Sequence, residues 1–248
     1  MKWVSLSALA LAFVVIAPTA AADVQWRVFQ LRREQCFNSA GEYTLEQSIH
    51  GCSELIRMRS IDGDGRAQAF KLRGDRYRQL EDFEAAEADY TQVIRMRGDH
   101  PGAYYRRSEV YLAQGRYPAA LDDADATVRI APDQPGGYRV RCQARLEMHA
   151  ETAAALNDCN TALEYHSSNT GALSARGVLY LQTRRYDEAW ADFDAALLHL
   201  GPHAHGLYGR GLAAQRLGRP NQAGADIARA LELDPEIAAT YAGYGVTR

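Results

Sequence analysis

The sequence of 248 residues lacks a strong charge of either sign, because 28 Lys and Arg are balanced by 31 Asp and Glu for a formal net charge of −3. So small an imbalance argues against a nucleic-acid-binding protein and against a polybasic membrane anchor. Glycine, at 20 residues, and proline, at 8, are too scarce for a collagen-like or low-complexity chain. The length of 248 residues then allows one or two ordinary folded domains, or one elongated array.

Catalytic and metal-binding motifs are also missing from the sequence. It contains no Cys-x-x-Cys and no paired Cys and His at zinc spacing. A glycine-rich phosphate loop, a G-x-S-x-G elbow and an H-E-x-x-H helix are absent too. We therefore expect no enzyme and no cofactor.

Two clusters resemble metal sites without completing one. The stretch Asp62–Gly65 resembles the start of a calcium loop, but Arg73 stands where that loop requires glutamate, so a flexible linker is favoured. His199, His203 and His205 could hold a metal ion, although solvated histidines of a turn are the favoured interpretation.

A long hydrophobic run occurs only near the N-terminus. Residues 6–17 are apolar, follow Met1-Lys2, and precede the small residues Ala20-Ala21-Ala22. This pattern predicts a secretory signal peptide at residues 1–22, whose apolar run is too short to cross a bilayer comfortably. We expect a periplasmic or secreted bacterial protein with no membrane insertion after cleavage; an uncleaved anchor is the alternative.

The dominant positive feature is an internal repeat of about 34 residues. Phe70–Tyr77 matches Leu173–Tyr180, and Asp82–Tyr90 matches Arg185–Phe193. Five units fit, at residues 67–100, 101–134, 135–169, 170–203 and 204–235. Three columns define their register: large residues at position 4 (Phe70, Tyr104, Tyr138, Leu173, Leu207), small ones at position 8 (Gly74, Ser108, Cys142, Gly177, Gly211), and alanine at position 20 (Ala86, Ala120, Ala155, Ala189, Ala223).

These columns resemble the tetratricopeptide repeat, a unit of two antiparallel helices. The resemblance implies an all-α fold: an α-solenoid of stacked helix hairpins wound as a right-handed superhelix. Each hairpin buries its apolar face only by stacking on its neighbours, so the end units need covering. Residues 236–248 are expected to form a C-terminal capping helix, and residues 61–66 a linker before the first unit.

The four cysteines fall on the repeat register. Cys142 at position 8 and Cys159 at position 24 face each other across one hairpin. Cys36 and Cys52 are 16 residues apart, the separation of positions 8 and 24 in a unit without the one extra residue of the third unit, which extends the array to a divergent N-terminal hairpin at residues 23–60. Four cysteines allow three pairings, and only Cys36–Cys52 with Cys142–Cys159 joins facing positions. An exported protein meets the oxidising compartment that disulfides need, and free buried thiols are the alternative.

Two charged columns accompany the small and large ones. Position 7 is always arginine (Arg73, Arg107, Arg141, Arg176, Arg210) and position 23 always aspartate (Asp89, Asp123, Asp158, Asp192, Asp226). Because every arginine is matched by an aspartate, we expect a structural ladder of ion pairs along the stack. A row of arginines that binds anions is the less favoured alternative.

The resemblance also implies where a partner binds. In this family the first helix of each unit lines the concave face, and positions 5 and 9 point into the groove. Those positions hold Lys71, Asp75, Tyr105, Glu109, Arg139, Gln143, Tyr208 and Leu212, a mixed groove with aromatic and arginine anchors. The carboxylate clamp of chaperone-binding members wants asparagine where Asp75 stands, so an acidic C-terminal tail is not the expected ligand.

The signal peptide, the N-terminal cysteine hairpin and the repeats together resemble small periplasmic tetratricopeptide repeat proteins of proteobacteria. That resemblance implies a non-enzymatic scaffold or adaptor of the cell envelope that binds a protein or peptide in its groove. A chaperone-like accessory factor for envelope protein or lipoprotein assembly is the alternative. Nucleic acid is not an expected partner.

Overall fold

The computed structural model describes residues 20–247 and is all-α within that range. The signal peptide predicted for residues 1–22 lies almost entirely outside the described residues, and the first helix begins at Ala20. The helices are α1 (Ala20–Phe37), α2 (Leu45–Arg57), α3 (Gly63–Gln79), α4 (Phe83–Met96), α5 (Pro101–Ala113), α6 (Tyr117–Ile130), α7 (Pro135–Glu147), α8 (Thr152–Tyr165), α9 (Thr170–Gln182), α10 (Tyr186–Leu200), α11 (Ala204–Arg216), α12 (Pro220–Leu233) and α13 (Ile237–Gly243).

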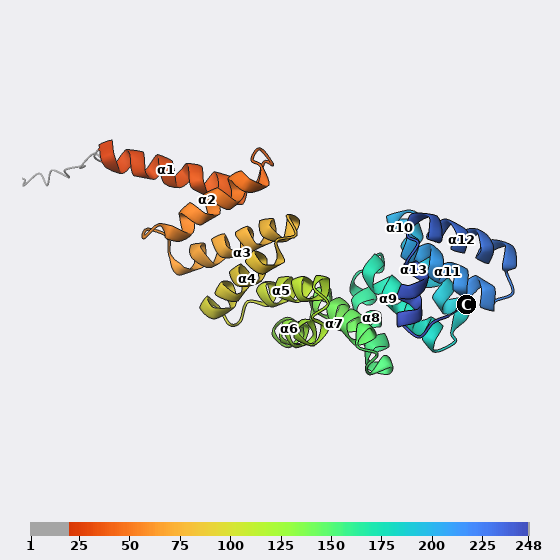
Figure 1. Cartoon of the computed structure of the whole chain (residues 1–248). Helices are drawn as coiled ribbons and strands as arrows, with labels where there is room; N and C mark the ends of the chain where they lie inside the picture. The colour runs from red at the N-terminus through yellow and green to blue at the C-terminus, as the bar shows by residue number, and fades with distance from the viewer. Residues whose placement is uncertain (1–19, 248) are drawn as a thin grey trace, which may run out of the picture.

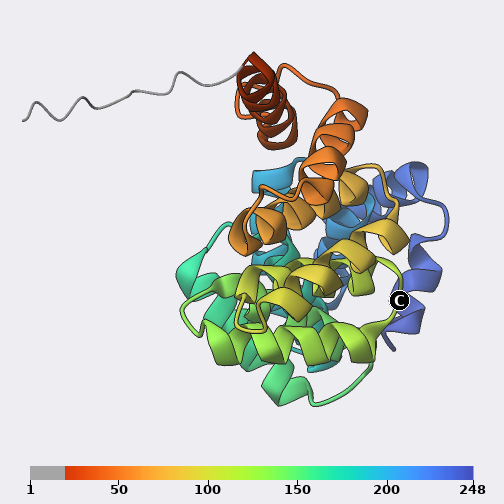
Figure 2. The same cartoon turned by 90° about the vertical axis from the view of Figure 1, so that its left-hand side faces the viewer.

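Consecutive helices pair into hairpins that stack in chain order (Figure 1). The first helices of neighbouring hairpins, α3, α5, α7, α9 and α11, contact one another in sequence and so share one face of the array. Figure 2, seen from the α1 end, shows the hairpins winding about a common axis. The predicted α-solenoid fold is confirmed.

Position 8 is glycine in three units because a side chain from the second helix fills the space above it, an aromatic ring over Gly74 and Gly177 and Ile227 over Gly211. A Cβ added to Gly74 would lie 2.9 Å from a Tyr90 ring carbon, and one added to Gly177 would lie 2.8 Å from Phe193. Both rings are 0% exposed. The columns of the repeat are therefore packing requirements, since interiors packed this densely leave no room for another methyl group.

The linker expected at residues 61–66 is wrong in its last four residues, which form the first turn of α3. The Asp62 carboxylate accepts a hydrogen bond of 2.7 Å from the Gly65 amide, which caps the helix one turn earlier than the repeat register suggests. Arg66 ties this turn back to the Met58 carbonyl at 3.1 Å. The Asp62 carboxylate is therefore the N-cap of α3, in a segment for which the sequence favoured a flexible linker.

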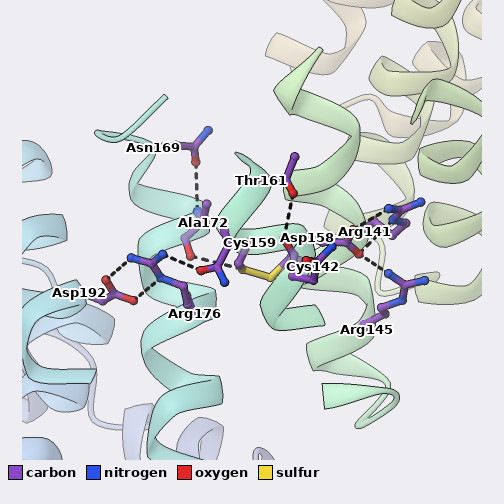
Figure 3. Close-up of a disulfide and its surroundings, with 12 residues drawn as sticks. Arg141, Cys142, Arg145, Asp158, Cys159, Thr161, Asn169, Ala172, Arg176 and Asp192 are labelled. Atoms are coloured by element: carbon purple, nitrogen blue, oxygen red, sulfur yellow. Dashed lines mark hydrogen bonds and ion pairs between the residues drawn. A yellow bond between two sulfur atoms is a disulfide. The ribbon is translucent and has the colours of Figure 1, made fainter. Parts of the chain in front are cut away.

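Both disulfides join the two helices of a single hairpin. Cys36–Cys52 links α1 to α2 with Cα atoms 4.5 Å apart, and Cys142–Cys159 links α7 to α8 at 5.4 Å. All four cysteines are 0% exposed. Figure 3 shows the second disulfide beside the ion pair of Arg141 with Asp158.

The C-terminal end of the stack is covered by α13. Its Tyr241 is 0% exposed and donates a 2.8 Å hydrogen bond to the His205 carbonyl at the start of α11. The Tyr241 ring lies 5.0 Å from that of Tyr208 between centroids. Only Ile237–Gly243 of the segment expected to cap the array is helical. No helix between residues 20 and 247 is both long and apolar enough for a membrane span.

Candidate partner-binding groove

The charged columns meet inside each hairpin. Every position-7 arginine donates two hydrogen bonds, 2.6–3.0 Å long, to both oxygens of its position-23 aspartate. The five aspartates are only 1–7% exposed. Such a planar, two-pronged pairing is the strong form of a charge-assisted hydrogen bond. The hydrogen bond to Asp89 raises the pKa of Arg73, and that to Asp123 raises the pKa of Arg107, so both arginines stay charged.

Each of these arginines also reaches the preceding hairpin. The remaining terminal nitrogen donates a hydrogen bond of 2.6–2.9 Å to a polar side chain on the preceding second helix; the acceptors are Ser53, Thr91, Asp125, Asn160 and Asp194. One guanidinium therefore joins three helices. Since their donors are used between helices, the five arginines serve the stack and are not arranged as an anion-binding row.

The N-terminal half of the shared face carries a chain of alternating charges. Lys71 on α3 lies 3.0 Å from Asp75, and Arg106 on α5 bridges Asp75 at 3.5 Å and Glu109 at 2.9 Å. Arg139 on α7 then contacts Glu109 at 2.7 Å. Four predicted groove residues are thus brought together across three hairpins, with side chains 13–23% exposed.

Tyr105 belongs to the same row of interacting side chains. We call this row the charged groove and define it by Lys71, Asp75, Tyr105, Arg106, Glu109 and Arg139. The Tyr105 hydroxyl donates to Glu109 at 2.8 Å and accepts from Arg139 at 3.3 Å. Gln143 lies one turn beyond Arg139 on α7 and is half-buried. These contacts hold the predicted anchors in fixed positions before any partner arrives.

Sequence reasoning missed one member of this surface, Arg106, and one buried residue that supports it, Tyr90. Arg106 stands at position 6, which we did not assign to the groove, yet its guanidinium lies between two predicted groove acids. The spacing of three residues from Arg106 to Glu109 was the signal available, since such pairs meet on one helix face. Tyr90 on α4 donates 2.8 Å to Asp75; burial, with the Asp75 charge, raises the pKa of Tyr90 well above its ordinary value.

The C-terminal half differs from the expected open groove. Tyr208 and Leu212 are each only 3% exposed, because α13 and the residues after it pack over α11. The prediction that these two side chains line an open groove, with Tyr208 as an anchor, is therefore wrong. His205, expected to be solvated, lies beneath the same cover 5.0 Å from the Tyr241 ring, and its burial lowers the pKa of the imidazole to about 4.

The chain matches the tetratricopeptide repeat family at residues 71–135 and 149–205, and a second description of the same repeat matches at 204–237. The chain belongs to the tetratricopeptide repeat family. Such repeats suggest a scaffold for protein–protein interaction, and scaffolds of this family bind proteins or peptides and are typically non-enzymatic.

Solved structures show the same fold at low sequence identity. A tetratricopeptide repeat protein from Parabacteroides merdae is 16% identical, with a TM-score of 0.66 over 84% of this chain and 80% of that chain. YrrB is 19% identical, with a TM-score of 0.56 over 75% and 93%. MamA from Desulfovibrio magneticus is 18% identical, with a TM-score of 0.59 over 70% and 95%. No curated protein matches the chain.

Proposed function

We propose that the protein is a non-enzymatic scaffold that binds a protein or peptide segment of mixed charge in the charged groove. One observation carries the proposal: five charged side chains of alternating sign and one tyrosine line up across α3, α5 and α7, on the face that the first helices share. The solved structure of YrrB is described as a tetratricopeptide repeat protein with an unusual peptide-binding site, which supports this use of the fold.

Because the charged side chains of the groove are already paired with one another, a partner binds by replacing one member of an ion pair and not by meeting an unpaired charge. A partner carboxylate that reaches Arg139 or Arg106 replaces Glu109, and a partner cation replaces Lys71 beside Asp75. Charges arranged in this way contribute more to the choice of partner and to the rate of encounter than to affinity. Tyr105 and Arg139 are residue types that dominate binding energy at interfaces, so they are the anchors we assign.

Capture of partners from an envelope fraction tests the groove. The variant Tyr105→Ala with Arg139→Ala is expected to lose specific partners that the unchanged protein retains. Tyr165→Ala with Arg229→Ala is the matched control, because these exposed side chains lie on second helices away from the groove. Partners captured equally by both variants would contradict the assignment of the groove.

Export to the periplasm or out of the cell is part of the proposal. It is supported by the signal-peptide pattern of residues 1–22 and by two disulfides, which an oxidising compartment would maintain. Mass spectrometry of the protein from an envelope fraction is expected to show a chain beginning at Asp23. A chain found only in the cytosol with Met1 or Lys2 at its start would contradict export.

A chaperone-like accessory role in envelope protein or lipoprotein assembly is favoured by one further observation. The first helix exposes several apolar side chains, among which Val24 is 60%, Trp26 59% and Leu31 42% exposed. Large exposed apolar patches mark surfaces that bind other proteins or membranes. This role predicts promiscuous, transient capture of unfolded envelope proteins that Trp26→Ser weakens, whereas a dedicated scaffold retains one set of partners.

A further inference from the structure

Residues 244–247 turn back over the first helices of the preceding repeats. After α13 ends, the Gly245 amide donates to the Ala242 carbonyl at 2.9 Å and the Val246 amide to Tyr241 at 3.0 Å. Gly245 has a φ of +73°, so the turn is a Schellman motif, which stops a helix and reverses the chain. This turn sends Tyr244–Thr247, which we call the C-terminal segment, toward α9 and α7; in Figure 1 the C-terminus lies beside α11.

Three consecutive repeats hold this segment with the same repeat position. Position 13 is Glu147 on α7, Gln182 on α9 and Arg216 on α11. Glu147 accepts 3.0 Å from the Tyr244 hydroxyl, the Gln182 amide donates 2.8 Å to the Tyr244 carbonyl, and Arg216 donates 3.1 Å to the Thr247 carbonyl. Two of the three hydrogen bonds are donated to main-chain carbonyls of the segment, and the third is accepted from its tyrosine hydroxyl.

An apolar wall and a hollow complete the surface. Leu181 and Leu212, 5% and 3% exposed, belong to the core cluster against which Tyr244 and Val246 pack. A cavity of about 430 Å³ lies between these leucines and the segment, bordered by Gln182, Arg216 and Gly245–Thr247. The segment thus fills only part of the space that the first helices offer.

We propose that Glu147, Gln182, Arg216, Leu181 and Leu212 form a second peptide-binding site, which the chain's own C-terminal segment occupies. The site takes a non-helical segment in which a tyrosine is followed by small and β-branched residues. A partner carrying that chemistry binds by displacing Tyr244–Thr247. The inference rests on the proposed function, because it describes how access to one half of the binding face is regulated.

Tethering explains why displacement matters. A segment joined to its site by a short connection has an effective concentration of order mM. A free peptide of equal intrinsic affinity, present at about 1 μM, is therefore outcompeted for the site by roughly a thousandfold. The occupied site therefore stays closed to weak ligands and opens to one with additional contacts. The charged groove begins on the adjacent α7 and supplies such contacts, so a partner that binds both surfaces gains access where a short peptide does not.

The test uses a fluorescent synthetic peptide corresponding to residues 243–248 and measures its anisotropy with the full chain. The unchanged protein is expected to bind the peptide at least tenfold more weakly than a full-length variant with Tyr244→Ala and Gly245→Ala. The first substitution removes the Glu147 contact, and the second strains the turn where an added Cβ meets nothing within 4 Å. Circular dichroism checks that both proteins stay helical and cooperative.

A second pair of variants identifies the site. In the released background, Gln182→Ala is expected to weaken peptide binding at least fivefold, whereas Gln215→Ala, an exposed glutamine on α11, leaves it unchanged. Equal affinity of the unchanged and released proteins for the peptide, or no binding to either, overturns the proposal. Capture through Tyr105 and Arg139 is measured separately, so the charged groove can fail or succeed independently of this site.

Discussion

The guanidinium of each position-7 arginine links its own helix to two others through hydrogen bonds. We therefore expect this arginine to contribute more to stability than any other polar residue of its repeat. Arg107 holds Asp123 through two hydrogen bonds of 2.7 and 2.8 Å and Thr91 through a third of 2.9 Å. Removing one partner of a buried pair leaves an uncompensated charge, which costs far more than the pair itself contributes.

We therefore expect Arg107→Ala to lower the free energy of unfolding by about 3 kcal/mol, because Asp123 is left charged and 5% exposed. The exposed pair Arg229–Glu232 is the control, and Arg229→Ala should cost less than about 1 kcal/mol. Urea denaturation of the single and double variants measures both values. A double-mutant cycle in which Arg107 and Asp123 show no coupling would contradict the pairing.

Glycines in the repeats differ in whether the surrounding structure has room for a side chain in their place. Gly177→Ala is expected to destabilise the protein by about 1–3 kcal/mol, because the new methyl group meets Phe193 at 2.8 Å. Gly224→Ala, inside α12, meets nothing within 4 Å and should stabilise the helix by about 0.5–1 kcal/mol. Thermal denaturation compares the two, and a neutral Gly177→Ala would refute the packing explanation for position 8.

The residue columns were predictable where packing alone dictates them. Gly74 and Gly177 follow from the aromatic rings above them, and the matched arginine and aspartate columns indicated their pairing. Tyr208 was mispredicted because its position normally faces an open groove, and nothing in the repeat pattern shows that the chain returns to cover it. Arg106 was missed because its role depends on two neighbouring hairpins.

At the scale of elements, the ends of the array carry the exceptions to the pattern. The helix α3 begins at Gly63 because Asp62 offers a cap, and local capping is invisible to a repeat register. The helix α13 is seven residues long, too short to be stable alone, and depends on Tyr241 packing against α11. Boundaries of this kind need the structure, whereas the order and pairing of the helices did not.

The cover formed by α13 should respond to pH through His205. Burial lowers the pKa of His205 to about 4, whereas an unfolded histidine titrates near 6.5, so the unfolded state binds more protons between these values. Stability is thus complete above pH 6.5 and falls as pH decreases toward 4. Thermal denaturation from pH 7.5 to 4.5 should show this loss in the unchanged protein and a smaller one in His205→Phe.

His199→Phe serves as the control for this titration, because His199 is an exposed residue at the end of α10 and should leave the pH dependence unchanged. The aromatic rings that face His205 are those of Phe193, Tyr241 and Tyr244, which stay neutral over this range, whereas the charge of His203 adds to the effect of burial in lowering the pKa of His205. The same slope in His205→Phe as in the unchanged protein would show that other groups cause the loss.

The first hairpin is held by its own cross-link and one neighbour. Cys36–Cys52 closes a loop of 16 residues in sequence separation, and such a cross-link stabilises a fold by about 3 kcal/mol. Cys36→Ser with Cys52→Ser is expected to make α1 and α2 sensitive to limited proteolysis while α3 to α12 resist. Cleavage throughout the chain at equal rates would show that the hairpin is not an independent unit.

The whole molecule is a linear array, so its stability is a sum of local terms. Each hairpin packs against its immediate neighbours, and the contacts of α1 extend no further than α3. Damage at one end should therefore weaken the end hairpin and its immediate neighbour more than the rest of the array. The fold was predictable at this scale because one repeat, recognised once, specifies the rest.

The arginine contact across each junction makes the hairpins interchangeable. If residues 135–169 were removed, Arg176 would lose Asn160 but meet Asp125, the side chain that already accepts a hydrogen bond from Arg141. Both cysteines of the second disulfide would leave together, so no lone thiol remains. A gene encoding such a chain can gain or lose a hairpin through unequal recombination and still encode a complete set of junctions.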